Sequence, residues 1–271
     1  MRLLVVSDLH GSAELLGRFL RPDDLLLSLG DHLNVIDYKD LSGVLAEFVP
    51  RETIESTLAA IQSGDLDDAR RRMATAAGSV PNLFRLIRVT AEKAYDAMSR
   101  AIPCPGYFIY GNVDFPEVLA PNLGDDHHLC LAEKLEIAGR RVGLVSGHPP
   151  GPYSFGMPGE IPATEFSKRL HEVGAVEILG IHSPPSIPGL TYDVAAARDE
   201  GGSDDLLYYC RLHRPRLVLF GHVHQPQLAE FVDVELPDEP IRYINVGCFR
   251  DTHRLLEIEP HTLEARWLTV D

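Results

Sequence analysis

The sequence predicts a layered α/β fold in which parallel strands alternate with helices. Short apolar runs recur along the chain and each ends in a polar residue or glycine, as in RLLVV before Ser7 and RLVLF before Gly221. The runs are apolar at odd and even positions alike, which is typical of strands buried on both faces. Helical segments lie between several of them, and this order indicates parallel pairing.

The strands are predicted from runs of four to six mostly apolar residues that stop at a turn signal. In chain order they are RLLVV (2–6), DLLLSL (24–29), GYFIY (106–110), RVGLV (141–145), VEILGI (176–181), RLVLF (216–220) and RYINV (242–246). Such strands, buried on two faces, place the centre of the sheet in the protein core.

Helices are predicted over three segments between these strands, at 12–21, 163–173 and 203–213. In the first, leucines and Phe19 share one face, and Pro22 ends the helix. In the third, Ser203 suits the N-cap position, and two acids follow in the first turn, where they favour the helix dipole.

Between about 35 and 103 the strand pattern stops. Three helical stretches occupy this region: ETIESTLAAIQ, DLDDARRRMATAA and NLFRLIRVTAEKAYDAMSRAI. One crossover needs fewer helices, so the region is interpreted as a helical insertion within a single domain that spans residues 1–271. Two roles stay open for it, a cap over the functional site or a purely structural helical layer.

Composition and charge narrow the functional classes. The chain has 271 residues, 45% of them hydrophobic and 24% charged, as expected for one large α/β domain. Its formal net charge of −15 argues against binding to nucleic acid polymers, including nuclease activity on them. The arginine run at 70–72 is interpreted as a solvated helix face.

Cysteine usage and hydropathy bear on location. The four cysteines lie far apart and form no CxxC pair, so neither a disulfide framework nor a structural zinc site is expected. They are interpreted as mostly buried small apolar residues, and a reducing cytoplasm is predicted. No run reaches the length of a membrane span, so no membrane partner is expected. The oligomeric state is left open.

Polar side chains follow the predicted strands at the points where the strands end. They are Asp8, His10, Asp31, Asn112, Asp114, His182, His222 and His224. Ligands of parallel α/β sheets bind at the carboxyl ends of the strands, so these side chains are expected to converge. In extended chain, residues i and i+2 point the same way, which directs both imidazoles of GHVH toward one region. Carboxylate, imidazole and amide groups suit Mn, Fe, Zn or Ni.

The order of the motifs DLH, GDHLN, GNVD, an isolated His and GHVH resembles the calcineurin-like metallophosphoesterase superfamily. The resemblance implies two packed mixed β-sheets flanked by helices, a four-layer sandwich with a dinuclear metal centre at the sheet edges. It implies two divalent ions (Mn, Fe, Zn or Ni): one bound by Asp8, His10 and His224, the other by Asn112, His182 and His222, with Asp31 bridging both.

The same resemblance implies a phosphoester hydrolase whose nucleophile is a hydroxide that bridges the two ions. Asp31, Asn112 and His182 would then be the catalytic residues, and Asn112 would also help to position the phosphate. The partner is expected to be a small phosphate ester. Because all seven ligand positions carry competent residues, the alternative of a non-catalytic scaffold is disfavoured.

Two features of the motifs leave choices open. His182 fits the isolated histidine better than His148, because in longer relatives this histidine follows a later strand and precedes a proline-rich turn, and because the predicted helix and GHVH come next. His148 is then either a pocket residue that binds substrate or a solvent-exposed loop residue. Val113 stands where many relatives carry a histidine that protonates the leaving group. Such general-acid catalysis raises the reaction rate by a factor of about 10²–10⁴. A phosphodiesterase acting on a small or nucleotide-type diester is therefore predicted, with a phosphomonoesterase or nucleotide pyrophosphatase as the alternatives.

Three further residues near the motifs receive predictions. His32 follows Asp31 directly; by strand alternation it should point away from the site, so a structural role is favoured over substrate binding. Arg250, in NVGCFRDTHR, could reach a phosphate of the substrate. Asp114, with no neighbouring histidine to orient, is expected to cap the turn DFPEV. Asn34 is expected to support the loop after Asp31.

Overall fold

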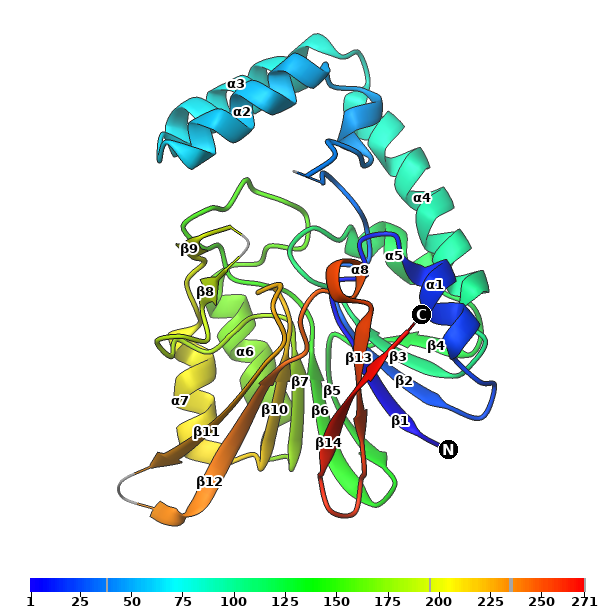
Figure 1. Ribbon diagram of the computed structural model, residues 1–271, viewed down its shortest axis with the longest axis vertical. Coiled ribbons are helices and arrows are strands. Elements are labelled where there is room, and N and C mark those ends of the chain that lie inside the picture. The colour runs from blue at the N-terminus through cyan, green and yellow to red at the C-terminus, as the bar shows by residue number, and fades with distance from the viewer. Residues whose placement is uncertain (38, 195, 234–235, 271) are drawn as a thin grey trace.

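A computed structural model describes residues 1–37, 39–194, 196–233 and 236–270. Within these residues the strands form two six-stranded sheets and one two-stranded ribbon. The sheets pack against each other at the centre of the molecule, with helices on their outer faces (Figure 1). The predicted fold class, two packed mixed sheets flanked by helices, is therefore confirmed.

The first sheet has the order β14-β13-β1-β2-β3-β4. Its parallel part consists of β1 (Leu3–Val6), β2 (Leu25–Leu29), β3 (Gly106–Ile109) and β4 (His127–Leu129). Two antiparallel strands extend it beyond β1, namely β13 (Arg254–Ile258) and β14 (Ala265–Thr269). The carboxyl ends of β1, β2 and β3 consequently meet at one edge of the sheet.

The second sheet has the order β11-β12-β10-β7-β6-β5. Its parallel strands are β6 (Arg140–Val145), β7 (Ile178–Ile181), β10 (Leu217–Phe220) and β12 (Leu236–Asn245). The antiparallel edge strands are β5 (Ala132–Ile137) and β11 (Gln227–Asp233). The ribbon is formed by β8 (Tyr192–Asp193) and β9 (Arg198–Asp199). All seven predicted strands are confirmed, whereas the antiparallel edge strands were not predicted.

Alternation along the strands separates the core into layers. In β1, Leu3 and Val5 belong to the cluster between the two sheets, and Leu4 and Val6 pack under the helices of the first sheet. A third cluster lies between the second sheet and its helices, with Phe220 among its members. The central strands are thus apolar on both faces at most positions, because both faces are covered.

The predicted helices are present. The first sheet carries α1 (Ala13–Phe19), α4 (Leu83–Ala101), α5 (Pro116–Asn122) and the short α8 (Phe249–Thr252), and the second sheet carries α6 (Ala163–Val173) and α7 (Asp204–His213). Of these, α5 and α8 were not predicted. The predicted cap of α7 is confirmed: the hydroxyl of Ser203 accepts a hydrogen bond of 3.1 Å from the amide of Leu206.

The region 35–103 divides into two parts after the short 3-10 helix Leu45–Glu47. Helix α4 buries Leu83, Ile87 and Tyr95 in the core of the first sheet, so it is a structural layer. Helices α2 (Arg51–Gln62) and α3 (Leu66–Ser79) pack on each other and project beyond the strand ends (Figure 1). Helix α4 therefore fits the structural layer, and a cap over the site stays a prediction for α2 and α3.

The α2–α3 hairpin contacts the loop that follows β6. Ala60, Ile61 and Ala69 form a small apolar cluster against which Tyr153 and Phe155 of that loop pack. The expectation for the arginine run is only partly right. Arg71 and Arg72 pair with Asp68 at the surface, but Arg70 donates hydrogen bonds to the carbonyl oxygens of Pro152 (3.3 Å) and Ser154 (3.1 Å).

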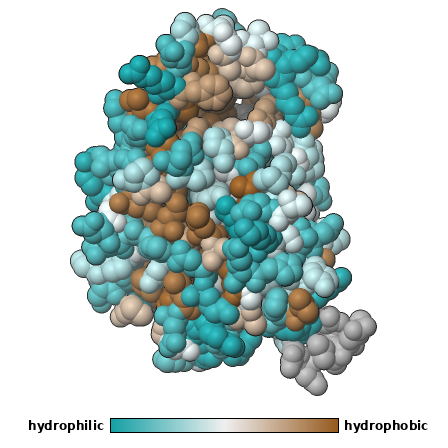
Figure 2. Space-filling model, turned by 180° about the vertical axis from the view of Figure 1, so that it is seen from behind, coloured by the Kyte–Doolittle hydropathy of each residue, from teal (hydrophilic) through white to brown (hydrophobic). Residues whose placement is uncertain are grey.

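The rear face of the molecule carries separate apolar patches with hydrophilic surface between them (Figure 2). Phe84, at the start of α4, is 84% exposed. In the described parts of the chain, none of the helices combines the length and the apolar character needed to cross a bilayer.

Candidate metal centre

The loops after β1 and β2 are joined by their backbones at the edge of the first sheet. The amide of Asp8 donates to the carbonyl oxygen of Gly30, and that of His10 to the carbonyl oxygen of Asp31, both at 3.0 Å. The loop after β10 closes on them, because the amide of His222 donates to Oδ2 of Asp8 at 3.1 Å. The three motifs are thereby brought to one place.

Several ligand candidates sit in an unusual backbone conformation. Asp8 (φ 54°), His10 (φ 40°), Asp31 (φ 54°) and His222 (φ 69°) all lie in the left-handed region. Residues other than glycine rarely adopt it, and such strain concentrates at functional sites. Here it turns the carboxylates and imidazoles at the strand ends into a shared space.

Two glycines allow this close approach. A Cβ atom on Gly111 would lie 2.2 Å from Oδ1 of Asp31 and 2.7 Å from Nε2 of His182. A Cβ atom on Gly221 would lie 2.6 Å from Oδ2 of Asp8. The glycines in GNVD and GHVH therefore make room for the candidate ligands, because the Cβ atom of any other residue would collide with the ligand atoms.

Backbone carbonyls orient two of the histidines. Nδ1 of His10 lies 3.2 Å from the carbonyl oxygen of Leu33, and Nδ1 of His182 lies 2.8 Å from that of Leu29. Because a carbonyl oxygen only accepts, each Nδ1 is the protonated nitrogen. Such outer contacts fix the tautomer of metal-binding histidines. In the neutral ring, Nε2 then offers its lone pair to the site.

One group of side chains has polar atoms that lack a partner. Oδ1 of Asp8 and Nε2 of His10 lie 3.8 Å apart, and neither has a hydrogen-bond partner among the described residues although both atoms are buried. An unsatisfied buried polar atom costs about 1–3 kcal/mol. One carboxylate oxygen of Asp31 lies within 4.8 Å of a ligand atom of Asp8 and a ligand atom of His10. These residues fit a divalent metal ion, which would satisfy the orphaned atoms.

A second group adjoins the first through Asp31. Oδ1 of Asn112 lies 3.1 Å from Nε2 of His182 and 3.0 Å from Nδ1 of His222. Nε2 of His182 also lies 3.4 Å from Oδ2 of Asp31. An amide oxygen, two imidazoles and a carboxylate form another donor set that fits a divalent metal. Asp31 lies at the junction of the two groups.

The pKa values of these side chains reflect burial first and neighbouring charge second. Burial raises the pKa of Asp8. Burial lowers the pKa of His10 and brings that of His222 to about 3. Burial also opposes ionisation of Asp31 and His182, but the attraction between their opposite charges outweighs the effect of burial. The pKa of Asp31 therefore falls and that of His182 rises to about 9. Neutral imidazoles are the metal-binding form.

Asp114 does not cap the DFPEV turn, contrary to expectation; instead its buried carboxylate holds the loop after β2. It accepts hydrogen bonds from the amides of Asp31 (2.9 Å), His32 (3.0 Å) and Gly111 (3.0 Å). Tyr95 of α4 donates a further bond of 3.0 Å. The first turn of α5 has no side-chain cap bond. Sequence reasoning missed this role, although the position in GNVD was a signal.

His32 is buried behind the loop. Its Nδ1 lies 3.0 Å from Oδ2 of Asp114 and its Nε2 lies 2.9 Å from the hydroxyl of Ser28. Both ring nitrogens are therefore engaged by the protein. This geometry agrees with the predicted structural role and leaves no ring nitrogen of His32 for a substrate.

His148 is not solvent-exposed, which corrects one of its two interpretations. Its side chain is buried and its ring stacks on that of His222, with the ring centroids 4.2 Å apart. Nδ1 lies 2.6 Å from the hydroxyl of Ser183. One ring nitrogen of His148 lies within 4.8 Å of ring nitrogens of His182 and His222. His148 thus belongs to the wall of the site.

His224 and Arg250 are linked through Asp251. Nδ1 of His224 lies 3.5 Å from Oδ2 of Asp251, while the Arg250 guanidinium pairs with Asp251 (3.4 Å) and Asp37 (3.1 Å). Arg250 also donates to Oδ1 of Asn34 at 3.4 Å. Arg250 and Asn34 therefore hold the loop after β2, and contact of Arg250 with a substrate stays a prediction.

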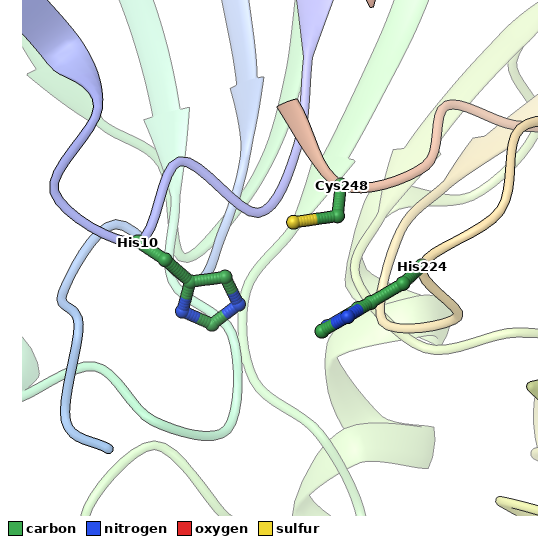
Figure 3. A group of neighbouring side chains, drawn as sticks. All are labelled: His10, His224 and Cys248. Carbon is green, nitrogen blue, oxygen red and sulfur yellow. The ribbon is translucent and has the colours of Figure 1, made fainter. Parts of the chain in front are cut away.

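Cys248 and Asp193 are further residues that sequence reasoning left out of the site. The thiol of Cys248 points between the rings of His10 and His224 (Figure 3). Oδ2 of Asp193 accepts a hydrogen bond of 3.1 Å from the amide of His224. Cys248 ends the segment NVGC, which begins at the end of β12 and was the signal for it, whereas Asp193 ends the short strand β8 and belongs to no motif. All four cysteines are free and buried, as predicted.

Comparisons with known proteins bear on the family and the fold. A model of the calcineurin-like phosphoesterase family matches residues 1–226. The crystal structure of TT1561 of Thermus thermophilus matches with a TM-score of 0.59 at 15% identity, covering 100% of this chain and 99% of that one. The phosphopantetheinyl hydrolase PptH from Mycobacterium tuberculosis matches with a TM-score of 0.50 at 13% identity, covering 100% and 96%. No curated protein matches the chain.

The chain belongs to the calcineurin-like phosphoesterase family, since the family model spans most of its length. It is a metal-dependent hydrolase of phosphoric ester bonds. At their low identity, the two solved structures show the shared fold alone. The described residues supply groups of histidine and aspartate that could hold the metal ions.

Proposed function

We propose that this chain is a dinuclear metal-dependent phosphodiesterase that acts on a small or nucleotide-type diester. The observation that carries the proposal is Val113. Its amide donates a 3.1 Å hydrogen bond to Oδ1 of Asp31, so the residue stands beside the metal centre, yet its side chain has no proton to give. An alkoxide leaving group of a monoester would go without the acid that many relatives place here.

The ligand sets of the proposal follow the two groups of side chains. Asp8, His10 and His224 hold one ion, Asn112, His182 and His222 hold the other, and Asp31 bridges them. The orphaned Oδ1 of Asp8 and Nε2 of His10 support the first set. The convergence of both imidazoles on Oδ1 of Asn112 supports the second. When bound, the ions supply Lewis acidity toward the phosphoryl group and activate water for in-line attack.

The remaining residues of the site bind and position. Asn112 and His148 contact the phosphate, because both lie beside His222 of the second group. Arg250 lies in α8 and contributes positive charge near the first group, where its amide donates to the carbonyl oxygen of Asp8 and its guanidinium to Oδ1 of Asn34. His32 acts as a positioning residue, since Asp114 and Ser28 engage its ring.

The substrate is small, and the protein acts as one domain in the cytoplasm. The net charge of −15 disfavours long polyanions. The α2–α3 hairpin and the loop after β6 touch each other beyond the strand ends, which supports a cap that limits substrate size. Four free, buried cysteines support a reducing compartment. Residues 1–271 are proposed as a single domain with its insertion at 35–103.

The test compares Mn²⁺-dependent turnover of bis-p-nitrophenyl phosphate with that of p-nitrophenyl phosphate. We expect the diester to be the better substrate in kcat/KM. Val113→His should then raise turnover of an alkyl phosphate monoester, whose alkoxide leaving group needs a proton, and Asp31→Asn should abolish turnover of every ester. A monoester preference in the unaltered protein would overturn the diesterase proposal and favour a phosphomonoesterase, in which His148 offers the nearest alternative donor. Absence of metal-dependent turnover of either ester would favour a scaffold.

A further inference from the structure

Cys248 lies against the first group of candidate ligands. Its Sγ atom and ring nitrogens of His10 and His224 all lie within 4.8 Å of one another. Figure 3 shows the thiol directed into the space between the two rings. The residue is completely buried and its sulfur lies 3.3 Å from the carbonyl oxygen of Asp8. A thiol therefore borders the place where the first ion would be held.

The backbone fixes this thiol in position. The amide of Cys248 donates to the carbonyl oxygen of His224 at 2.8 Å, and the amide of Phe249 donates to that of Ser7 at 3.0 Å. Cys248 is thus tied to the GHVH loop and to the end of β1. These are the two segments that carry His224 and Asp8. Any movement of the first group would carry the cysteine with it.

Independent atoms aim at the same space. Oδ1 of Asp8 and Nε2 of His10 are buried and have no hydrogen-bond partner among the residues that the structure describes. The thiol itself makes only a weak hydrogen bond to the Asp8 carbonyl, because S–H is a weak donor. Little hydrogen-bond energy is therefore lost when the sulfur turns toward those orphaned atoms.

We propose that Cys248 is a sulfur ligand of the ion held by Asp8, His10 and His224. On binding, the S–H bond breaks, a metal–sulfur bond forms, and the proton leaves to the buffer. Metal–sulfur bonds of about 2.3 Å and metal–nitrogen bonds of about 2.0–2.1 Å place such donors within about 4 Å of each other. The observed spacing needs only a small adjustment. The inference rests on the proposed dinuclear centre.

A thiolate changes which ion the first group prefers. Soft sulfur donors favour Zn, Fe or Co over Mn and Mg, whereas carboxylate and imidazole alone discriminate less. The second group has no cysteine in its donor set, so the two positions differ in softness. The proposal therefore predicts a centre whose first position selects a softer ion than its second.

The experiment uses the full chain loaded with Co²⁺ and its absorption spectrum. The unaltered protein should show visible d–d bands from both ions and a near-ultraviolet sulfur-to-cobalt charge-transfer band. Cys248→Ser should lose the charge-transfer band and retain the d–d bands. Zn²⁺ affinity should fall roughly 10–100-fold, the usual cost of losing a supporting group at a metal site, while Mn²⁺ affinity changes less.

Cys130→Ser is the matched control, because Cys130 also lies within 4.8 Å of a histidine and a glutamate, His128 and Glu133. It should keep the charge-transfer band. Loss of the band in Cys130→Ser alone would overturn the inference and assign the sulfur to that cluster. Visible d–d bands without any charge-transfer band would overturn the role of Cys248 and leave the dinuclear centre intact. No cobalt bands at all would overturn the dinuclear centre together with the inference.

Discussion

At the scale of single residues, the site depends on glycines, which carry no side chain, as much as on the candidate ligands themselves. Gly111 has no side chain, and Asp31 and His182 fill the space where one would stand. Asp8, Asp31 and His222 accept a strained backbone that points their side chains inward. The donor atoms are thus placed by local geometry before any ion binds.

Gly111→Ala is expected to disrupt the metal centre. The added methyl group would stand 2.2 Å from Oδ1 of Asp31, so the carboxylate has to move. We expect metal content and metal-dependent kcat/KM to fall roughly 10–100-fold or more, as when a ligand loses its support. Metal analysis of the purified protein, alongside esterase assays, measures the effect.

Gly78→Ala provides the matched control, because a methyl group added to Gly78, on the exposed face of α3, would meet nothing within 4 Å. It should leave metal content unchanged and stabilise the helix by about 1 kcal/mol. Equal metal content in both variants would show that Gly111 is not needed for close packing.

At the scale of elements, one arginine and a small apolar cluster join the α2–α3 hairpin to the loop after β6. Arg70 binds two carbonyl oxygens of the loop after β6, and Tyr153 and Phe155 of that loop pack against the hairpin. His148 begins the same loop and stacks on His222. The hairpin is therefore linked mechanically to the wall of the site.

Arg70→Ala should loosen this loop without unfolding the protein. Loss of the two hydrogen bonds is expected to cost about 1 kcal/mol of local stability, which corresponds to roughly fivefold faster amide exchange. Hydrogen–deuterium exchange of peptides covering 150–160 measures it. Arg72→Ala, which removes only a surface pair with Asp68, should exchange like the unaltered protein. The link would be refuted by identical exchange in all three proteins.

At the scale of the whole molecule, the metal centre joins the two sheets. Asp8, Asp31 and Asn112 follow strands of the first sheet, while His182 and His222 follow strands of the second. Ions held between them would connect the sheets at the edge where their strands end. Asp8, whose pKa is raised by burial and whose Oδ1 has no hydrogen-bond partner among the described residues, gains the most from such an ion.

Removing metal should therefore lower the thermal stability of the entire protein. An ion at about 100 times its Kd stabilises the folded state by about 2.7 kcal/mol, and this corresponds to roughly 5–10 °C in Tm for a chain of this size. Thermal unfolding after chelation and again after adding Mn²⁺ or Zn²⁺ measures the shift. Asp31→Asn should show little response to added metal. A Tm that ignores metal would contradict ligation between the sheets.

The sequence by itself determined the central strands, most of the helices and the set of candidate ligands. These features are local. A run that is apolar at odd and even positions alike predicts a strand buried on both faces, and Ser203 caps α7 by accepting a hydrogen bond from a residue three positions later. The motif residues stand at strand ends, and parallel strands deliver their ends to one edge. Convergence of Asp8 with His222 could therefore be predicted before any contact was known.

Only the tertiary structure decided which distant groups meet. Asp114 binds the amide of Asp31 from 83 residues away, and Cys248 meets the carbonyl of Asp8 from 240 residues away. The burial of His148 and the reach of Arg70 likewise depend on loops that pack together across the fold. Local sequence patterns determine on which element a residue lies, but the partner of its side chain depends on how the two sheets and the hairpin pack. For this reason the supporting residues emerged from the fold, and the candidate ligands from the sequence.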